Sequence, residues 1–372
     1  MKRYYVPNIL SEAEFDDLRK KADTGDAVAQ LQVSLACDTG LRKLAEVMYA
    51  GDYRFYSEEQ RNELRDFAYD DLHKAKASGN MDALLLYASV SKNRKQKVGA
   101  LYESAKAGND IAAYNYWVII FRRYRYASRE VMDKFSKENI YSEALVFLLR
   151  AADNGNKNAA YAAFCFYELL LVNKRVLEEY TIELPGIDGC SEKELASACL
   201  KYLRTAAERG HSDAQFSLSL YYQGKDLIAD SLGAEKDIRL AEYWLSRSMS
   251  QDNPAAYLHL GNMYRSGDGR EKNNDEAYRC YVKVINVLKI PRSKRAYYDS
   301  EDKIYRSDYP WWDKELLKNA HKGMGDILHE KGDYAKALAH YKCVGEDKVF
   351  KYLKMMKRKG LEIPPLPEDY RP

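Results

Sequence analysis

The 372 residues are enough for two or three globular domains or for one elongated array. Apolar residues make up 46% of the chain and charged residues 31%, which favours a folded core over disorder. The net charge of +3 comes from 59 basic and 56 acidic side chains, and this near balance argues against a dedicated nucleic-acid or membrane-surface protein.

The first twenty residues, MKRYYVPNILSEAEFDDLRK, contain one short apolar patch followed directly by acidic residues, so no signal peptide is expected. No stretch approaches the roughly 20 apolar residues that cross a bilayer. These features predict a cytoplasmic protein without membrane insertion. The six cysteines lack CxxC spacing, which favours buried apolar thiols, although their even number leaves a disulfide framework open.

One pattern recurs along the chain. An amphipathic helix is expected to end at a glycine, an alanine follows four residues later, and a large apolar or aromatic side chain follows two residues after the alanine. The positions that end the helices, called anchors below, are Gly25, Gly79, Gly108, Gly155, Gly210 and, in a glycine's place, Asp252. The alanines are Ala29, Ala83, Ala112, Ala159, Ala214 and Ala256, and the large side chains are Leu31, Leu85, Tyr114, Tyr161, Phe216 and Leu258.

This pattern predicts an antiparallel pair of helices in each unit. Glycine adopts the left-handed conformation that closes a helix C-terminus. After it, an Asp-Ala or Asn-Ala pair opens a second helix, and its alanine lets two helix backbones approach closely. Strand signals are nearly absent, so the predicted fold class is all-α.

The segment AAYLHLGNMYRSGDGREKNNDEAYRCYVK, residues 255–283, resembles the Sel-one-like repeat, a relative of the tetratricopeptide repeat. The matching positions are Ala256, Leu260, Gly261, Tyr264, Gly267, Gly269, Ala277 and Tyr281. The segment 321–344, HKGMGDILHEKGDYAKALAHYKCV, looks more like a plain tetratricopeptide hairpin. The resemblance implies a right-handed superhelical α-solenoid of antiparallel helix pairs, used as a scaffold or adaptor for other proteins.

The expected organisation follows in chain order. Residues 1–19 form an N-terminal capping segment, and residues 20–289 form the repeat array with a loop insert at 172–192. Residues 290–315 form a second insert loop, 316–360 a tetratricopeptide-like helix pair, and 361–372 a proline-rich tail. The tail IPPLPEDYRP is either a ligand for a groove-binding domain or simply the end of the last helix.

No enzyme is expected. The six histidines are scattered, and HEKGD at residue 329 lacks the second histidine of a zinc-protease motif. Phosphate-binding, dinucleotide-binding and nucleophile-elbow motifs are absent from the sequence. We therefore expect no cofactor, no metal and no small-molecule substrate.

A protein partner is the leading expectation. The chain contains 32 tyrosines against 10 phenylalanines, and tyrosine is enriched at protein-binding surfaces. In tetratricopeptide-like arrays the first helix of each hairpin lines the concave face, and this geometry places one row of side chains toward a partner. The predicted row is Asp82, Lys92, Tyr114, Phe121, Asn158, Tyr161, Glu168, Asp213, Phe216, Gln223, Asn262 and Arg265. Alternatively, its aromatic members belong to the core and its charges are merely solvated.

Two versions of this function are open, a general intracellular scaffold and a bacterial immunity protein that blocks a cognate secreted toxin. Irregular repeat lengths and inserts favour the second. An alternative function is nucleic-acid binding, because basic and aromatic residues interleave in RRYRYASR (122–129) and KIPRSKRAYY (289–298). The near-balanced net charge favours reading these segments as solvated surface.

Overall fold

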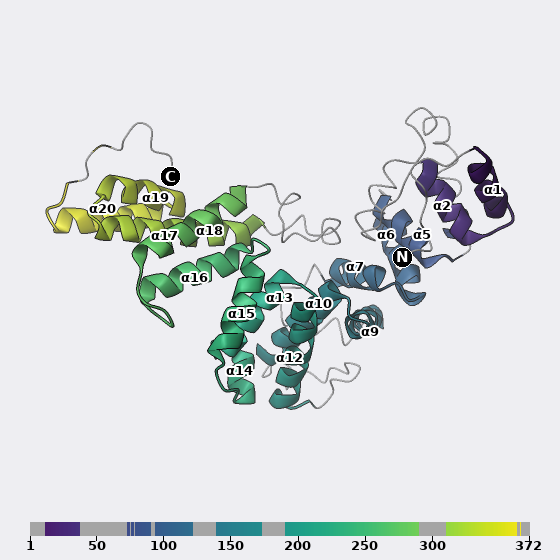
Figure 1. Cartoon of the computed structure of the whole chain (residues 1–372), viewed down its shortest axis with the longest axis horizontal. Coiled ribbons are helices and arrows are strands. Elements are labelled where there is room, and N and C mark those ends of the chain that lie inside the picture. Colours follow the sequence, from purple (N-terminus) through teal and green to yellow (C-terminus); the bar gives the residue numbers. More distant parts are fainter. Residues whose placement is uncertain are drawn as a thin grey trace. The chain divides into compact units, whose positions relative to one another are not determined.

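The computed structural model describes residues 12–37, 73–74, 76–77, 79–90, 94–121, 139–172, 190–289, 310–362 and 365. These residues form 16 helices and no strand, which confirms the predicted all-α class of antiparallel helix pairs (Figure 1). None of the described helices is long and apolar enough to span a bilayer. The structure shows free thiols at Cys165, Cys190, Cys199, Cys280 and Cys343.

The chain divides into two compact units, described here separately. The first contains the described residues up to Ala214 and the segment Gly224–Glu235; the second contains Gln215–Gln223 and the described residues from Lys236 onward. Helices of the first unit are α1 (Glu12–Asp23), α2 (Ala27–Cys37), α5 (Met81–Val90), α6 (Arg94–Lys106), α7 (Asp110–Phe121), α9 (Asn139–Asp153), α10 (Lys157–Val172), α12 (Glu192–Glu208) and α14 (Leu227–Leu232). Helix α13 (Ser212–Tyr222) has its first residues in this unit and the rest in the second.

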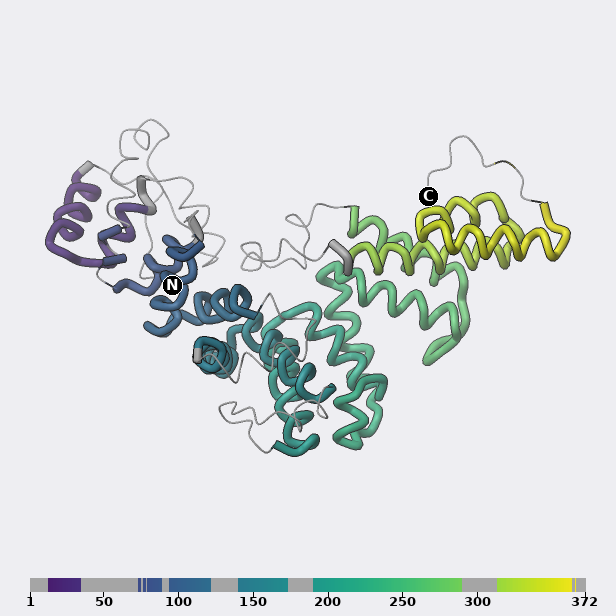
Figure 2. The backbone as a smooth tube through the Cα atoms, turned by 180° about the vertical axis from the view of Figure 1, so that it is seen from behind, coloured from purple at the N-terminus to yellow at the C-terminus, as the bar shows by residue number. Residues whose placement is uncertain are grey.

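Helices of the second unit are α15 (Ile238–Met249), α16 (Pro254–Ser266), α17 (Asn274–Lys289), α18 (Pro310–Glu330), α19 (Tyr334–Val344) and α20 (Glu346–Arg358). From α16 to α20 each helix packs on the next, and the two opposite views show them side by side (Figures 1 and 2). Two features differ from the expected C-terminal organisation. Helix α18 already begins at Pro310, and the segment expected to be a helix pair contains three helices, because Gly345 breaks its last stretch into α19 and α20.

The predicted inserts fall largely outside the described residues. The first lies between the end of α10 at Val172 and the start of α12 at Glu192, and residues 173–189 of it are outside the described part. Residues 290–309, residues 1–11 and all of the tail except residues 361, 362 and 365 are outside it as well.

The anchor positions adopt the backbone conformation that the sequence predicts. All five anchor glycines have positive φ, between 76° and 106°, and Asp252 has φ 56°. At Gly210 the amide donates to the Ala207 carbonyl, and the next amide, of His211, donates to the Ala206 carbonyl. This pair of bonds closes the helix C-terminus in a Schellman motif. The same two bonds occur at Asp252, where Asp252 donates to Met249 and Asn253 to Ser248.

The residue after each anchor caps the helix that follows. The Asn156 side-chain oxygen accepts from the amides of Asn158 (3.1 Å) and Ala159 (2.9 Å), and Asn253 does the same for Ala255 (2.9 Å) and Ala256 (3.4 Å). These bonds satisfy amides that a helix N-terminus otherwise leaves without a partner. One short turn therefore ends one helix and begins the next, and the six alanines that follow are at most 2% exposed.

Asp252→Gly should stabilise the chain by about 0.5–1 kcal/mol, because left-handed backbone is strained for aspartate and free of strain for glycine. Removing the Asp252 side chain costs little stability, because the hydrogen bond that its carboxylate accepts from the Tyr257 hydroxyl is long, at 3.4 Å. Gly210→Ala, at the equivalent turn, should destabilise by a similar amount. Urea unfolding of the full-length variants measures both changes in the free energy of unfolding. Two changes of the same sign would contradict the strain assigned to Asp252.

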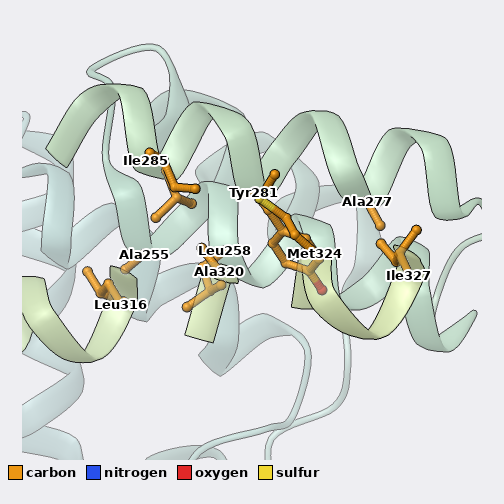
Figure 3. Close-up of a cluster of buried hydrophobic side chains, with 10 residues drawn as sticks. Ala255, Leu258, Ala277, Tyr281, Ile285, Leu316, Ala320, Met324 and Ile327 are labelled. Atoms are coloured by element: carbon orange, nitrogen blue, oxygen red, sulfur yellow. The ribbon is translucent and has the colours of Figure 1, made fainter. Parts of the chain in front are cut away.

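The core of the second unit lies between α16, α17 and α18. Ten buried side chains converge there, and Figure 3 shows Tyr281 of α17 among Ala277, Ala320 and Met324. Tyr281 is 0% exposed, and its hydroxyl donates to Asn262 Oδ1 at 2.8 Å. Two glycines make room for its ring. A methyl group at Gly261 would lie 2.7 Å from Tyr281 Cε1, and one at Gly323 would lie 2.5 Å from Cζ.

Candidate protein-binding face

The predicted row lies on the helices that follow the anchors, namely α5, α7, α10, α13 and α16, except that Gln223 comes directly after the end of α13. Lys92 lies outside the described residues. The other eleven members differ in how much of each side chain reaches the surface. Asp82, Tyr114, Asn158 and Gln223 are buried; Phe121, Tyr161, Glu168, Asp213, Phe216 and Arg265 are half-buried; Asn262 is exposed. A buried side chain offers a partner little surface, so the six half-buried residues and Asn262 are considered further. Phe121, Tyr161, Glu168 and Asp213 belong to the first unit, and Phe216, Asn262 and Arg265 to the second; each set is called the candidate face of its own unit.

In the first unit, the candidate face contains an aromatic pair. The Tyr161 ring of α10 stacks on the imidazole of His211, with centroids 4.2 Å apart and planes inclined by 24°. His211 precedes α13 and its Nδ1 accepts from the Ala214 amide at 3.3 Å, so this nitrogen carries no proton in the folded turn. Asp213 follows in the first turn of α13. The helix-opening turn thus fixes both the imidazole and the tyrosine that packs on it.

Glu168 lies farther along α10. Burial raises its pKa, and the nearby negative charge of Asp226 raises it further. The pKa of Asp226 is raised by burial too, although its carboxylate caps α14 by accepting from the Ala229 amide at 2.8 Å. The buried Cys199 thiol beside them has its pKa raised by burial and by Glu168, so the thiol remains protonated and a poor nucleophile. The pKa values of all three groups are raised mainly by burial, as expected where packed helices enclose polar side chains.

In the second unit, the candidate residues also hold neighbouring helices together. The Arg265 guanidinium donates to the Gly323 carbonyl (3.3 Å), to Asp326 (3.0 Å) and to Glu330 (3.4 Å), which ties α16 to α18. Phe216 packs against the clusters on both sides of α16 and meets the His259 ring at 5.7 Å. The partners of Arg265 were not identifiable from the sequence, because they lie 58 to 65 residues away.

Asp82 and Gln223, which the structure buries, link successive turns. Asp82 Oδ1 accepts from the Asn109 amide group at 2.9 Å, and Gln223 Oε1 lies 3.0 Å from His259 Nε2. Many of the tyrosines are likewise structural. Burial raises the pKa of Tyr116, Tyr167 and Tyr281 to about 12, as expected for phenols inside a helix array. The tyrosine excess is therefore partly a property of the core.

No group of three or more histidine, cysteine or acidic side chains in the described ranges is arranged to hold a metal ion. Two buried histidines do meet between α18 and α19, where His321 Nδ1 lies 2.8 Å from His340 Nδ1. The basic-aromatic segments proposed for nucleic acid lie outside the described residues, apart from Lys289 at the end of α17. Nucleic-acid binding stays a prediction, for which a steep salt dependence of binding is the test.

The family model for the Sel1 repeat matches this chain at residues 135–156, 187–211, 212–253 and 254–283. Among solved structures, a Sel1 repeat protein from Oxalobacter formigenes aligns with a TM-score of 0.43 and 16% identity over 93% of this chain and 92% of that one. The c5321 protein, a protective antigen present in uropathogenic Escherichia coli strains and displaying an SLR fold, aligns with a TM-score of 0.34 and 17% identity over 97% of this chain and 77% of that one. Among curated proteins, none matches the sequence.

Proposed function

We propose that this chain, which the Sel1-repeat model matches at four positions, is a non-catalytic interaction module that binds a partner polypeptide on the candidate face of its first unit. Sel1-repeat proteins generally serve as protein-interaction modules. The observation that carries the proposal for this chain is the half-buried, mixed composition of the face. Tyr161 offers a rigid aromatic surface, and Glu168 and Asp213 add polar groups beside apolar contacts.

We propose further that the partner is a single, dedicated protein in the bacterial cytoplasm, with a secreted toxin neutralised by a cognate immunity protein as the specific case. The support is the irregular spacing of the anchors, which is 29 residues from Gly79 to Gly108 and 55 from Gly155 to Gly210. A surface shaped for one partner tolerates such irregularity, whereas a general scaffold gains from regular repeats. A toxin or secretion-system gene beside this gene favours immunity, and its absence favours a general scaffold.

Combined substitution of Tyr161→Ala, Glu168→Gln and Asp213→Asn in the first unit should weaken partner binding at least tenfold, a typical effect when an aromatic anchor and nearby polar groups are removed together. The partner is first identified by affinity purification of the full chain from its native host and mass spectrometry. Calorimetric titration of the purified partner then gives the Kd. A control variant, Lys193→Ala with Glu208→Ala on exposed positions of α12, should leave the Kd unchanged. Equal affinities for both variants and the wild type would reject this face.

A further inference from the structure

Helix α20 is the last helix of the described residues, and one of its sides is fixed against the preceding helices. Tyr352 is 4% exposed and Met356 2%, and both join a buried cluster with Tyr341 of α19. The Tyr352 hydroxyl lies 3.3 Å from His329 Nδ1. The ammonium group of Lys348 lies 4.5 Å from the centre of the Tyr341 ring. The orientation of α20 is therefore set by packing.

The opposite side of α20 carries two exposed apolar side chains. Phe350 is 68% exposed and Leu353 is 44% exposed, and a spacing of three residues places them on one side of the helix. Lys354 and Lys357 stand four residues after each of them, and the Lys354 ammonium lies 6.0 Å from the centre of the Phe350 ring. We call these four residues the α20 outer face. Its composition combines apolar contacts with a rim of positive charge.

Charge along α20 is segregated. The two acidic residues, Glu346 and Asp347, both lie in the first turn. After these two residues every charged side chain of α20 is basic, namely Lys348, Lys351, Lys354, Lys357 and Arg358. A surface with two apolar side chains inside a basic rim is complementary to a segment that presents apolar side chains flanked by carboxylates.

The position of α20 in the stack indicates the shape of that segment. Helices α17, α18 and α19 each lie between two other helices, whereas α20 packs on α19 and no helix of the described residues follows it. The next element that fits such a stack is another helix. From these observations we propose that the α20 outer face binds an acidic amphipathic helix of a partner polypeptide, with apolar side chains on Phe350 and Leu353 and carboxylates beside Lys354 and Lys357.

A lipid surface fits this face less well. A helix that lies in a membrane interface carries its apolar stripe along its whole length. Here the stripe stops after Leu353, because residue 357 in the next turn is lysine and residue 360 is glycine. The α20 outer face shares no residue with the candidate face of the first unit, so either proposal stands without the other.

The test begins with the full chain and a phage library of helical peptides in which acidic, basic and apolar residues are randomised. We expect enrichment of acidic peptides that carry two apolar residues three or four positions apart. For the best peptide, fluorescence anisotropy should show Kd rising about tenfold or more in Phe350→Ser/Leu353→Ser and in Lys354→Glu/Lys357→Glu. Kd should also rise between 50 and 300 mM NaCl, because the lysine contacts are exposed to solvent.

Controls separate this face from general surface effects. Tyr243→Ser on α15 and Lys193→Glu on α12 remove an exposed aromatic and an exposed lysine elsewhere, and both should bind the peptide as the wild type does. Far-ultraviolet circular dichroism checks that each variant keeps its helices. The proposal is overturned if no peptide is enriched, if enriched peptides are neutral or basic, or if the α20 variants bind equally well. Binding of phosphatidylserine vesicles in place of peptide, or loss of self-association in the same variants, also overturns it.

Discussion

Gly323→Ala should destabilise the second unit by about 2 kcal/mol, although alanine is intrinsically the better helix former by about 1 kcal/mol. The added methyl group would lie 2.5 Å from Tyr281 Cζ, a distance that requires one of the groups to move. The ring has little room to do so, because it is fully buried, hydrogen-bonded to Asn262 and in contact with Gly261 on another helix. Overpacking of a filled core therefore outweighs the gain in helix propensity.

The matched control is Gly99→Ala in α6, where a methyl group would meet no atom within 4 Å. That substitution should stabilise the chain by about 0.5–1 kcal/mol, since only propensity and unfolded-chain entropy change. A double-mutant cycle isolates the contact further: in a Tyr281→Leu background, Gly323→Ala should cost much less than in the wild type. Urea unfolding of the full chain measures the wild type and the four variants. A stabilising Gly323→Ala would show that the glycine is not needed for the ring.

Stability of the second unit should fall as the pH is lowered from about 6.5 to about 4. Burial and, when charged, the neighbouring His321 together lower the pKa of His340 to about 4. The pKa of His321 is also lowered, by burial and by Lys289. Between these values and 6.5, the unfolded chain binds protons that the folded chain does not, so acid favours unfolding. The stabilisation is complete above pH 6.5, and the loss through His340 alone reaches about 3 kcal/mol near pH 4.

The double variant His321→Leu/His340→Leu removes both titrating groups from between α18 and α19. Its unfolding free energy should change less steeply than that of the wild type between pH 6.5 and 4.5, whereas above pH 7 the two profiles should run parallel. The measurement is urea unfolding at a series of pH values. Parallel profiles across the whole range would mean that the imidazoles are protonated without cost, contrary to their burial.

The turns were the most predictable part of this fold. A glycine with positive φ, the capping residue after it and the alanine four residues on are all local features, so each leaves its mark within a few letters of sequence. Asp252 illustrates the strength of this signal, because the sequence predicts a turn there although the position lacks glycine, and its φ of 56° confirms the turn. The packing of Tyr281 on Gly261 follows from the same repeat pattern.

The candidate face was less predictable, because exposure depends on partners far along the chain. Arg265 fits the predicted spacing for a surface residue, yet it binds Asp326 and Glu330 on a helix that begins more than forty residues later. Asp82 was expected to face a partner and instead accepts a bond from Asn109 of the next turn. Helical spacing assigns a side of the helix, but the length and contacts of the neighbouring helix decide whether that side stays open.

Tyr281 touches glycines on both of the helices beside its own, and this arrangement bears on how the chain unfolds. In an array where each helix contacts chiefly its sequence neighbours, neighbouring helices unfold cooperatively because of the contacts at their interfaces. Because one aromatic ring is shared by α16, α17 and α18, we expect these three helices to unfold together. Weakening the packing of Tyr281 would allow the C-terminal helices to unfold as a separate segment. That segment would then be accessible to proteases while the remainder of the array stays folded.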